Sequence, residues 1–212
     1  MTAPPQSTWV YHFTPIENLP GILESDGLAC NNQCETQQIS VAHQHIQDRR
    51  RRKRVPCGPG GNLHDYVPFY FCNRSPMMYA INGGAVASYD KGQGELVYLV
   101  LKLQSVAEAG LDFVFTDRHA ATGYAAFYTD PTNLREIDWD LMPATWWNNT
   151  PEYPDRKERK QAEFLVHEFV PWDLVEFLAV MTPRMKERVE TVLARHPTSA
   201  RRPVRVERGW YY

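Results

Sequence analysis

The segment Glu95–Leu103, with the sequence ELVYLVLKL, constrains the fold more than any other part of the chain. It has the length of one strand, and its apolar run is too continuous for a strand with one face in water. Burial on both faces requires a sheet that other elements cover on both sides. We therefore expect this segment at the centre of a sheet, with Asp112–Thr116 as a neighbouring strand.

Local patterns predict the other elements. Strand patterns occur at Trp9–Phe13, Val67–Phe71, Glu163–Val170 and Val175–Val180, with a short last strand within Pro203–Tyr212. Capping residues and helical periodicity predict helices over Ser40–Arg52, from Ser75 and Pro76 to Gly83, and from Thr182 and Pro183 to about Arg195. Because strands and helices are mixed without strict alternation, an α+β fold is favoured over a doubly wound sheet.

The residues after the first strand carry the signs of a helix start. Thr14 is expected to be the N-cap, Pro15 the first helical residue and Glu17 the partner that completes a capping box. Pro20 is expected to distort this helix, and Gly27 suits the turn that ends it.

A long segment, Asp130–Arg159, is rich in proline, asparagine, aspartate and tryptophan and is expected to contain at most short helical turns. Loops of this length within a compact domain are commonly functional. This segment is therefore a candidate for substrate contacts.

Length and composition limit the class of protein. With 212 residues and 43% hydrophobic content, residues 1–212 are expected to form a single domain. The sequence lacks an apolar run long enough for a membrane span and lacks a secretion signal, so a cytoplasmic protein with four free thiols is expected. The net charge of -2 argues against a protein that coats duplex DNA. The local basic block Arg49–Arg54 could be a solvated helix end or a nucleic-acid contact.

Three polar features are candidates for chemistry. His12 lies in an apolar strand, where a histidine can be either a hydrogen-bonded core residue or a ligand contact. Glu163 begins a strongly apolar strand, where a carboxylate is costly unless it has a partner or faces a cleft. The segment Ile46–Arg50 could direct a guanidinium at a pyrophosphate, because its planar fork makes bidentate contacts.

Other common site types find little support. The glycines at Gly58–Gly61 lack the lysine and serine of a phosphate loop and the spacing of a dinucleotide fingerprint, so they predict a turn. The spacing of Cys30, Cys34, His43 and His45 does not favour zinc, and no metal site is expected.

Several longer motifs, taken in order, resemble the DarT family of DNA ADP-ribosyltransferase toxins. They cover nearly the whole chain, and their joint order is more specific than any one of them. The segments are YHFT at Tyr11–Thr14, NLPGIL at Asn18–Leu23, HIQDRR at His45–Arg50, LHDYVPFYF and NRSPMMYAI within Leu63–Ile81, FVFTDRH at Phe113–His119 and KQAEFLV at Lys160–Val166.

The resemblance implies an ADP-ribosyltransferase fold, with a split central sheet, flanking helices and a cleft that binds NAD⁺. It also implies transfer of ADP-ribose to a thymine base in single-stranded DNA. The expected partner in the cell is a macrodomain antitoxin of the DarG type, and a monomer is the default expectation. Acceptors left open are guanine, RNA, a protein side chain or water. From another functional class, a non-catalytic single-stranded nucleic-acid-binding module would use the basic block and aromatic stacking.

The resemblance also implies roles for individual residues. Glu163 matches the catalytic glutamate, and Arg50 matches the essential arginine near the NAD⁺ phosphates and the reacting base. The remaining positions fall into two groups. The expected NAD⁺ contacts are His12, Phe13, Thr14, Gly21, Leu28 and Ala29, together with Arg50. The expected contacts to the target nucleotide are Arg74, Met77 and His119.

Overall fold

The computed structural model describes residues 2–34, 39–197 and 201–212. Its strands form an eight-stranded sheet in the order β10-β9-β4-β1-β3-β7-β5-β6, and a second sheet of two strands, β2-β8. The strands are β1 Trp9–Pro15, β2 Gly27–Ala29, β3 Tyr66–Tyr70, β4 Leu96–Lys102, β5 Phe113–Thr116, β6 Phe127–Tyr128, β7 Glu163–His167, β8 Phe169–Pro171, β9 Phe177–Val180 and β10 Val204–Val206. The α-helices are α1 Leu19–Glu24, α2 Gln44–Arg52, α3 Pro76–Asn82, α4 Leu103–Glu108, α5 Arg156–Arg159 and α6 Pro183–Leu193.

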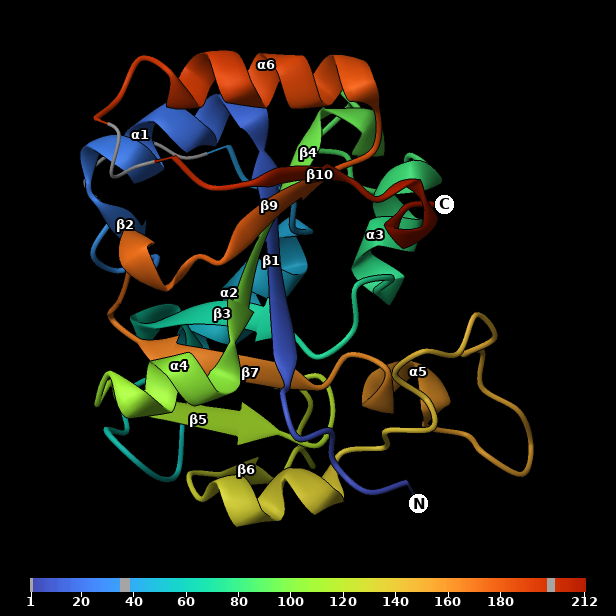
Figure 1. Ribbon diagram of the computed structural model, residues 1–212. Helices are drawn as coiled ribbons and strands as arrows, with labels where there is room; N and C mark the ends of the chain where they lie inside the picture. The colour runs from blue at the N-terminus through green and yellow to red at the C-terminus, as the bar shows by residue number, and fades with distance from the viewer. Residues whose placement is uncertain (1, 35–38, 198–200) are drawn as a thin grey trace.

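The large sheet is split between β1 and β3. Seven residue pairs join β1 to β4, whereas the register of β1 and β3 contains only the pair Tyr11 and Tyr70. In Figure 1 strands β1 and β4 run up the picture, whereas β3, β7 and β5 run across it. The expected α+β fold with a split central sheet is therefore confirmed.

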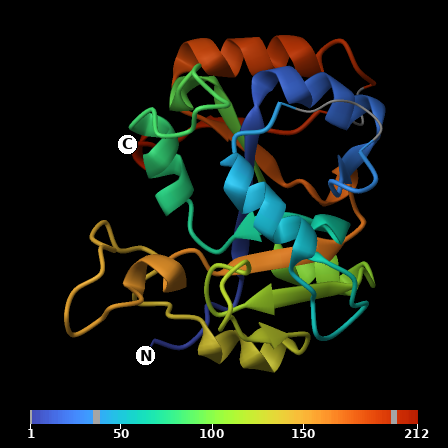
Figure 2. The same ribbon diagram turned by 180° about the vertical axis from the view of Figure 1, so that it is seen from behind.

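Helices flank both faces of this sheet. Helices α1 and α6 lie side by side at one end of the molecule, and α2 lies over the junction of the two half-sheets on the face seen in Figure 2. In the last turn of α2, Arg50 is buried, whereas Arg49, Arg51 and Arg52 are exposed. Among the described residues, no helix has both the length and the apolar character that a membrane span requires.

The predicted central strand is confirmed, and its predicted neighbour is wrong. Every residue from Leu96 to Leu101 in β4 is buried, and β4 pairs with β1 and β9. Strand β5 instead pairs with β6 and β7 in the other half-sheet. Helix α4 follows β4 directly and leads the chain away from it. Strands β4 and β5 therefore do not pair, although they are close in sequence.

The predicted helix cap at Thr14 is wrong, although a helical turn begins close to it. Strand β1 continues to Pro15, a 3-10 turn follows over Ile16–Asn18, and α1 begins at Leu19, with Pro20 in its first turn. The hydroxyl of Thr14 accepts a hydrogen bond from the side chain of Asn18, 2.9 Å away, and caps no helix. Gly27 begins β2 and is not the helix end.

The apolar run Glu163–Val170 forms two strands and not one. Strand β7 ends at His167, Glu168 has a φ of 60°, and β8 then pairs with β2 in the small sheet. By contrast, the predicted cap of α3 is confirmed, because the Ser75 side chain accepts from the amide of Met78. The cap of α6 by Thr182 is confirmed in the same way.

Candidate functional site

A cavity of about 540 Å³ opens beside the split in the sheet. Its size is in the range of small-molecule sites. Most of the residues expected in the site line it: His12, Phe13, Thr14, Leu28, Ala29, Arg50, Met77, His119 and Glu163. Gly21 and Arg74 are not among the lining residues.

Glu163 occupies the first position of β7, at the floor of this cavity, and only 2% of its surface is exposed. One carboxylate oxygen, Oε2, accepts a hydrogen bond from a terminal nitrogen of Arg50 at 2.8 Å. The other, Oε1, accepts from the amide of Ala120 at 3.0 Å. The amide of Glu163 donates to the hydroxyl of Thr116 at 3.2 Å. The carboxylate is therefore buried and held in one orientation.

Arg50 is the buried residue of α2, with 8% of its surface exposed. One terminal nitrogen pairs with Glu163, and the other, Nη2, is buried and has no hydrogen-bond partner within the described part of the chain. A buried donor without an acceptor is costly, because it has lost its bonds to water. Arg50 therefore has an open donor for an anionic or carbonyl group of a bound ligand.

The basic block around Arg50 supports the turn that follows β5. Arg49 donates to the carbonyl of Ala121 at 3.4 Å, and Lys53 donates to the carbonyl of Thr122 at 2.8 Å. The amide of Ala120 in the same turn binds Glu163. Part of this block thus has a structural function that the sequence pattern did not indicate.

His12 lies on β1 next to the split and bridges the two half-sheets. Its Nδ1 lies 2.9 Å from the carbonyl oxygen of Pro68, so Nδ1 must carry the proton, and Nε2 is an acceptor in the neutral ring. Burial lowers the pKa of His12, and the bond to Pro68 only partly opposes this shift. The neutral ring can therefore accept a hydrogen bond from a ligand hydroxyl.

This lowered pKa has a consequence for stability. In the unfolded chain a histidine ring takes up a proton near pH 6.5, whereas folded His12 remains neutral to a lower pH. As pH falls below about 6.5, the unfolded state therefore binds more protons, and the free energy of unfolding falls. We expect His12→Asn, which can still donate to the Pro68 carbonyl, to show a smaller loss. Urea unfolding of the wild type and of His12→Asn at pH 7.5 and 5.5 measures the loss in each protein. Equal losses would contradict the conclusion that His12 is neutral in the folded protein.

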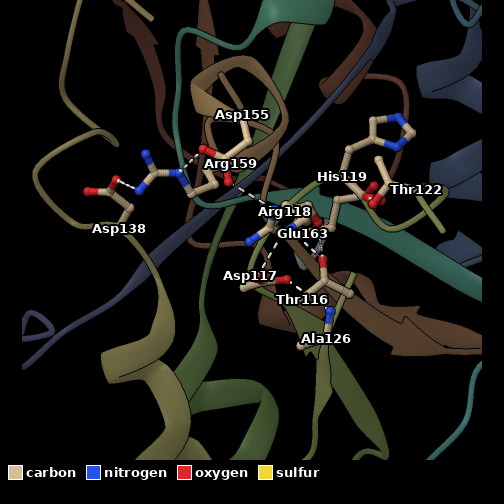
Figure 3. Close-up of polar contacts among 10 residues, drawn as sticks. All are labelled: Thr116, Asp117, Arg118, His119, Thr122, Ala126, Asp138, Asp155, Arg159 and Glu163. Atoms are coloured by element: carbon tan, nitrogen blue, oxygen red, sulfur yellow. Dashed lines mark hydrogen bonds and ion pairs between the residues drawn. The ribbon is translucent and has the colours of Figure 1, made fainter. Parts of the chain in front are cut away.

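His119 precedes the amide that binds Glu163. Its Nδ1 accepts from the amide of Ala121 at 3.1 Å, which leaves Nε2–H as a donor in the neutral ring. Burial is the main cause that lowers the pKa of His119, Glu163 raises it and Arg50 lowers it further. Figure 3 shows this histidine beside Thr122, whose hydroxyl donates to the His119 carbonyl at 2.9 Å.

Two residues of the site, the buried Asn18 and the half-buried Tyr70, had no signal in the sequence. The side-chain nitrogen of Asn18 donates to the hydroxyl of Thr14 and to the carbonyl of Ile39, and its side-chain oxygen accepts from the amide of Ile39. Asn18 therefore connects Ile39, which lines the cavity, to β1. Tyr70 faces Glu163 in the register of β3 and β7. Burial raises the pKa of Tyr70, and the nearby Glu163 adds to the shift. Only the register of β3 and β7 places Tyr70 opposite Glu163.

A chain of alternating charges connects the turn after β5 to the long loop (Figure 3). Arg118 pairs with Asp117 at 2.9 Å and with Asp155 at 3.0 Å. Arg159 pairs with Asp155 at 3.1 Å and with Asp138 at 2.7 Å. Because Arg118 is next to His119, this chain connects the loop to the segment that holds Glu163.

Lys160 anchors the same loop from within. Its ammonium group is buried and donates to the carbonyls of Leu141, Met142 and Ala144 at 3.1, 2.5 and 3.0 Å. Burial lowers the pKa of this lysine. The middle of the loop is thereby attached to Lys160, three residues before Glu163.

Replacement of Lys160 by methionine is expected to lower the free energy of unfolding by about 2 kcal/mol, because it leaves buried carbonyls without donors. Lys157→Met is the matched control, since Lys157 is exposed on the same short helix, and a change within about 0.5 kcal/mol is expected for it. Urea denaturation measures both. An equal, small effect of the two changes would show that the buried ammonium does not hold the loop.

Within the described ranges, no group of three or more histidine, cysteine, aspartate or glutamate residues could hold a metal ion. The polar groups converging on the cavity are a carboxylate, a guanidinium and two imidazoles. Such a set suits a ligand with anionic groups and hydroxyls, in which positive charge develops at one carbon.

Comparison with known proteins shows the family of this chain. The family model described as "ssDNA thymidine ADP-ribosyltransferase, DarT" matches residues 11–212. A DNA ADP-ribosyl transferase of Thermus sp. (strain 2.9) is 47% identical over 208 residues, which is 98% of each chain.

Solved structures of the same relative agree in fold over the whole chain. The structure of Thermus sp. 2.9 DarT in complex with ADP-ribosylated ssDNA has a TM-score of 0.95 and 45% identity, over 100% of this chain and 99% of that one. Its complex with NAD⁺ has a TM-score of 0.91 and 43% identity, over 99% and 100%. This chain therefore belongs to the DarT family of single-stranded DNA thymidine ADP-ribosyltransferases.

Proposed function

We propose that this enzyme transfers ADP-ribose from NAD⁺ to a thymine base in single-stranded DNA and releases nicotinamide. The observation that carries the proposal is the buried pair of Glu163 and Arg50, 2.8 Å apart at the cavity, with one guanidinium nitrogen unpartnered among the described residues. A non-catalytic binding module would have no use for a buried carboxylate held in this way, because its charge is costly to bury.

NAD⁺ fits the donor set of the cavity. His12 has an acceptor nitrogen there, and Thr14 has a hydroxyl at the same wall. We assign these residues to the nicotinamide and its ribose, with main-chain help from Phe13. Leu28 and Ala29 complete the apolar wall of the pocket, and Gly21 supports it from within α1.

Glu163 is assigned to the ribose. When the bond between the ribose carbon and nicotinamide breaks, positive charge develops on the ribose ring, and a carboxylate near its hydroxyls orients the ring and stabilises that charge. The bond from Arg50 and the amide of Ala120 keep the carboxylate in place throughout the reaction. A new bond from a thymine nitrogen to the same carbon completes the transfer, and the proton of that nitrogen is released.

Arg50 is assigned to charge stabilisation and not to proton removal. A guanidinium keeps its proton in proteins, so it is a poor base. Its unpartnered Nη2 can instead donate to the NAD⁺ phosphates or to the base as it loses its proton. His119 and Met77 line the same cavity and are assigned to the target nucleotide. Arg74 is assigned to the DNA outside the cavity.

Single-stranded DNA avoids the cost of a few kcal/mol for extruding a base from a duplex. This agrees with the net charge of -2, which suits a short contact with one strand better than a broad contact with duplex DNA. We further propose that the chain acts as one catalytic domain and as a monomer, in the cytoplasm, where DNA and NAD⁺ are available. A macrodomain antitoxin of the DarG type, which would remove the modification, is the proposed partner.

The test is incubation with NAD⁺ and three DNA substrates. They are a single-stranded oligonucleotide, its duplex, and a version in which deoxycytidine replaces every thymidine. We expect release of nicotinamide and a mass increase of one ADP-ribose only with the single-stranded, thymidine-containing substrate. Consumption of NAD⁺ that is independent of all three would instead indicate RNA, a protein side chain or water as acceptor.

A further inference from the structure

Tyr212 contacts three segments at one point outside the cavity. Its hydroxyl accepts a hydrogen bond from the indole nitrogen of Trp147 in the long loop at 3.0 Å. Its ring meets that of Tyr79 on α3 edge to face, with centroids 5.0 Å apart. The guanidinium carbon of Arg74 lies 4.2 Å from the same ring centroid. The tyrosine thus joins the loop, α3 and the segment before α3.

The backbone of Tyr212 is fixed independently of the loop. Its amide donates to the side-chain oxygen of Gln93 at 2.8 Å, and its carbonyl accepts from the side-chain nitrogen of Gln93. Gln93 also donates to Asn82, the last residue of α3, at 2.7 Å. The backbone that carries the ring is therefore held in place by Gln93 and not by the long loop.

The side chains around the Tyr212 ring are of the types that bind single-stranded DNA. The Nε atom of Arg74 is buried and lacks a hydrogen-bond partner within the described ranges, so it offers a donor to an acceptor on a ligand. Tyr79 is 54% exposed, and Trp146, next to the buried Trp147, is 77% exposed. Aromatic faces beside a cation are the usual platform for unpaired bases.

We propose that Tyr212 is a positioning residue that holds Arg74 and the long loop in the arrangement that single-stranded DNA requires outside the cavity. The inference rests on the proposed function and adds a residue to its DNA side. The contacts of Tyr212 are with residues outside the cavity lining, which contains the proposed NAD⁺ contacts His12, Thr14 and Glu163. A change at Tyr212 should therefore weaken use of DNA and leave NAD⁺ binding unchanged.

The experiment compares Tyr212→Ala, Tyr212→Phe and Trp147→Phe with the wild type. We expect Tyr212→Ala to raise the KM for a single-stranded, thymidine-containing oligonucleotide about tenfold, because the support of Arg74 is lost. Tyr212→Phe keeps the ring beneath Arg74 and is expected to raise KM only about threefold. Trp147→Phe removes the hydrogen bond from the loop to the Tyr212 hydroxyl and keeps the bond from that hydroxyl to the carbonyl of Arg74 at 3.4 Å, so it should raise KM by less than about threefold. The Kd for NAD⁺, from calorimetry, should stay within about twofold throughout.

The matched control is Trp139→Phe, which removes an indole hydrogen bond in the same loop, to the carbonyl of Leu134 at 2.7 Å and away from Tyr212. It should leave the KM for DNA unchanged. A Tyr212→Ala protein with the wild-type KM, or with a parallel loss of NAD⁺ affinity, would overturn the proposal. A wild-type protein that modifies no DNA would overturn the proposed function itself, which separates the two failures.

Discussion

Replacement of Glu163 by glutamine is expected to lower the rate of ADP-ribose transfer by about 10³-fold and to leave the fold intact. The amide has the shape of the carboxylate and can still bind one of its two donors, Arg50 or the amide of Ala120. It lacks the negative charge that opposes the positive charge on the ribose. The effect should therefore fall on the rate at saturating NAD⁺ and DNA, and not on NAD⁺ binding.

Single-turnover kinetics with both substrates saturating measure this rate. Glu176→Gln is the control, because Glu176 is exposed and forms a surface pair with Lys102 at 3.5 Å, outside the cavity lining. It should behave as the wild type. A Glu163→Gln protein that binds NAD⁺ and reacts within about tenfold of the wild-type rate would remove the carboxylate from the mechanism.

Removal of the charge of Arg50 is expected to have the largest effect on stability. Arg50→Met keeps much of the side-chain volume and leaves the buried carboxylate of Glu163 without its cation. We expect the free energy of unfolding to fall by about 3 kcal/mol. The double variant Arg50→Met with Glu163→Gln should recover more than half of this loss, because no uncompensated charge stays buried.

Urea denaturation of the two single variants and the double variant gives the coupling between them. The control is Arg188→Met, which breaks the more exposed pair of Arg188 and Glu95 at 2.8 Å. It should cost less than about 1 kcal/mol. Additive effects of the Arg50 and Glu163 changes would mean that the pair does not act as a unit in the folded protein.

The sequence predicted those elements whose signal is local. The cap of α3 by Ser75 depends on residues three positions apart, and the burial of β4 depends on its own apolar run. The errors occurred where distant contacts decide the outcome. Thr14 could have capped a helix, but pairing with β4 extends β1 through this residue to Pro15, and the first helical turn starts at Ile16 without a side-chain cap. The apolar run after Glu163 breaks at Glu168 because its second half pairs with β2.

The candidate site followed a similar division. His12, Arg50 and Glu163 were singled out from their residue types and from a family resemblance, and the fold brings them to one cavity. The groups that hold them were not visible in the sequence. The amide of Ala120 lies 43 positions before the carboxylate it binds, and an amide is carried by almost every residue. Only the folded chain shows which one is used.

Mass spectrometry of a mixed-sequence pool of single-stranded DNA, digested to nucleosides after incubation with NAD⁺, shows directly which base is modified. We expect ADP-ribose attached to thymidine with the wild-type protein and its loss with Glu163→Gln. Modification of another base, or an adduct that persists without the Glu163 carboxylate, would contradict this expectation.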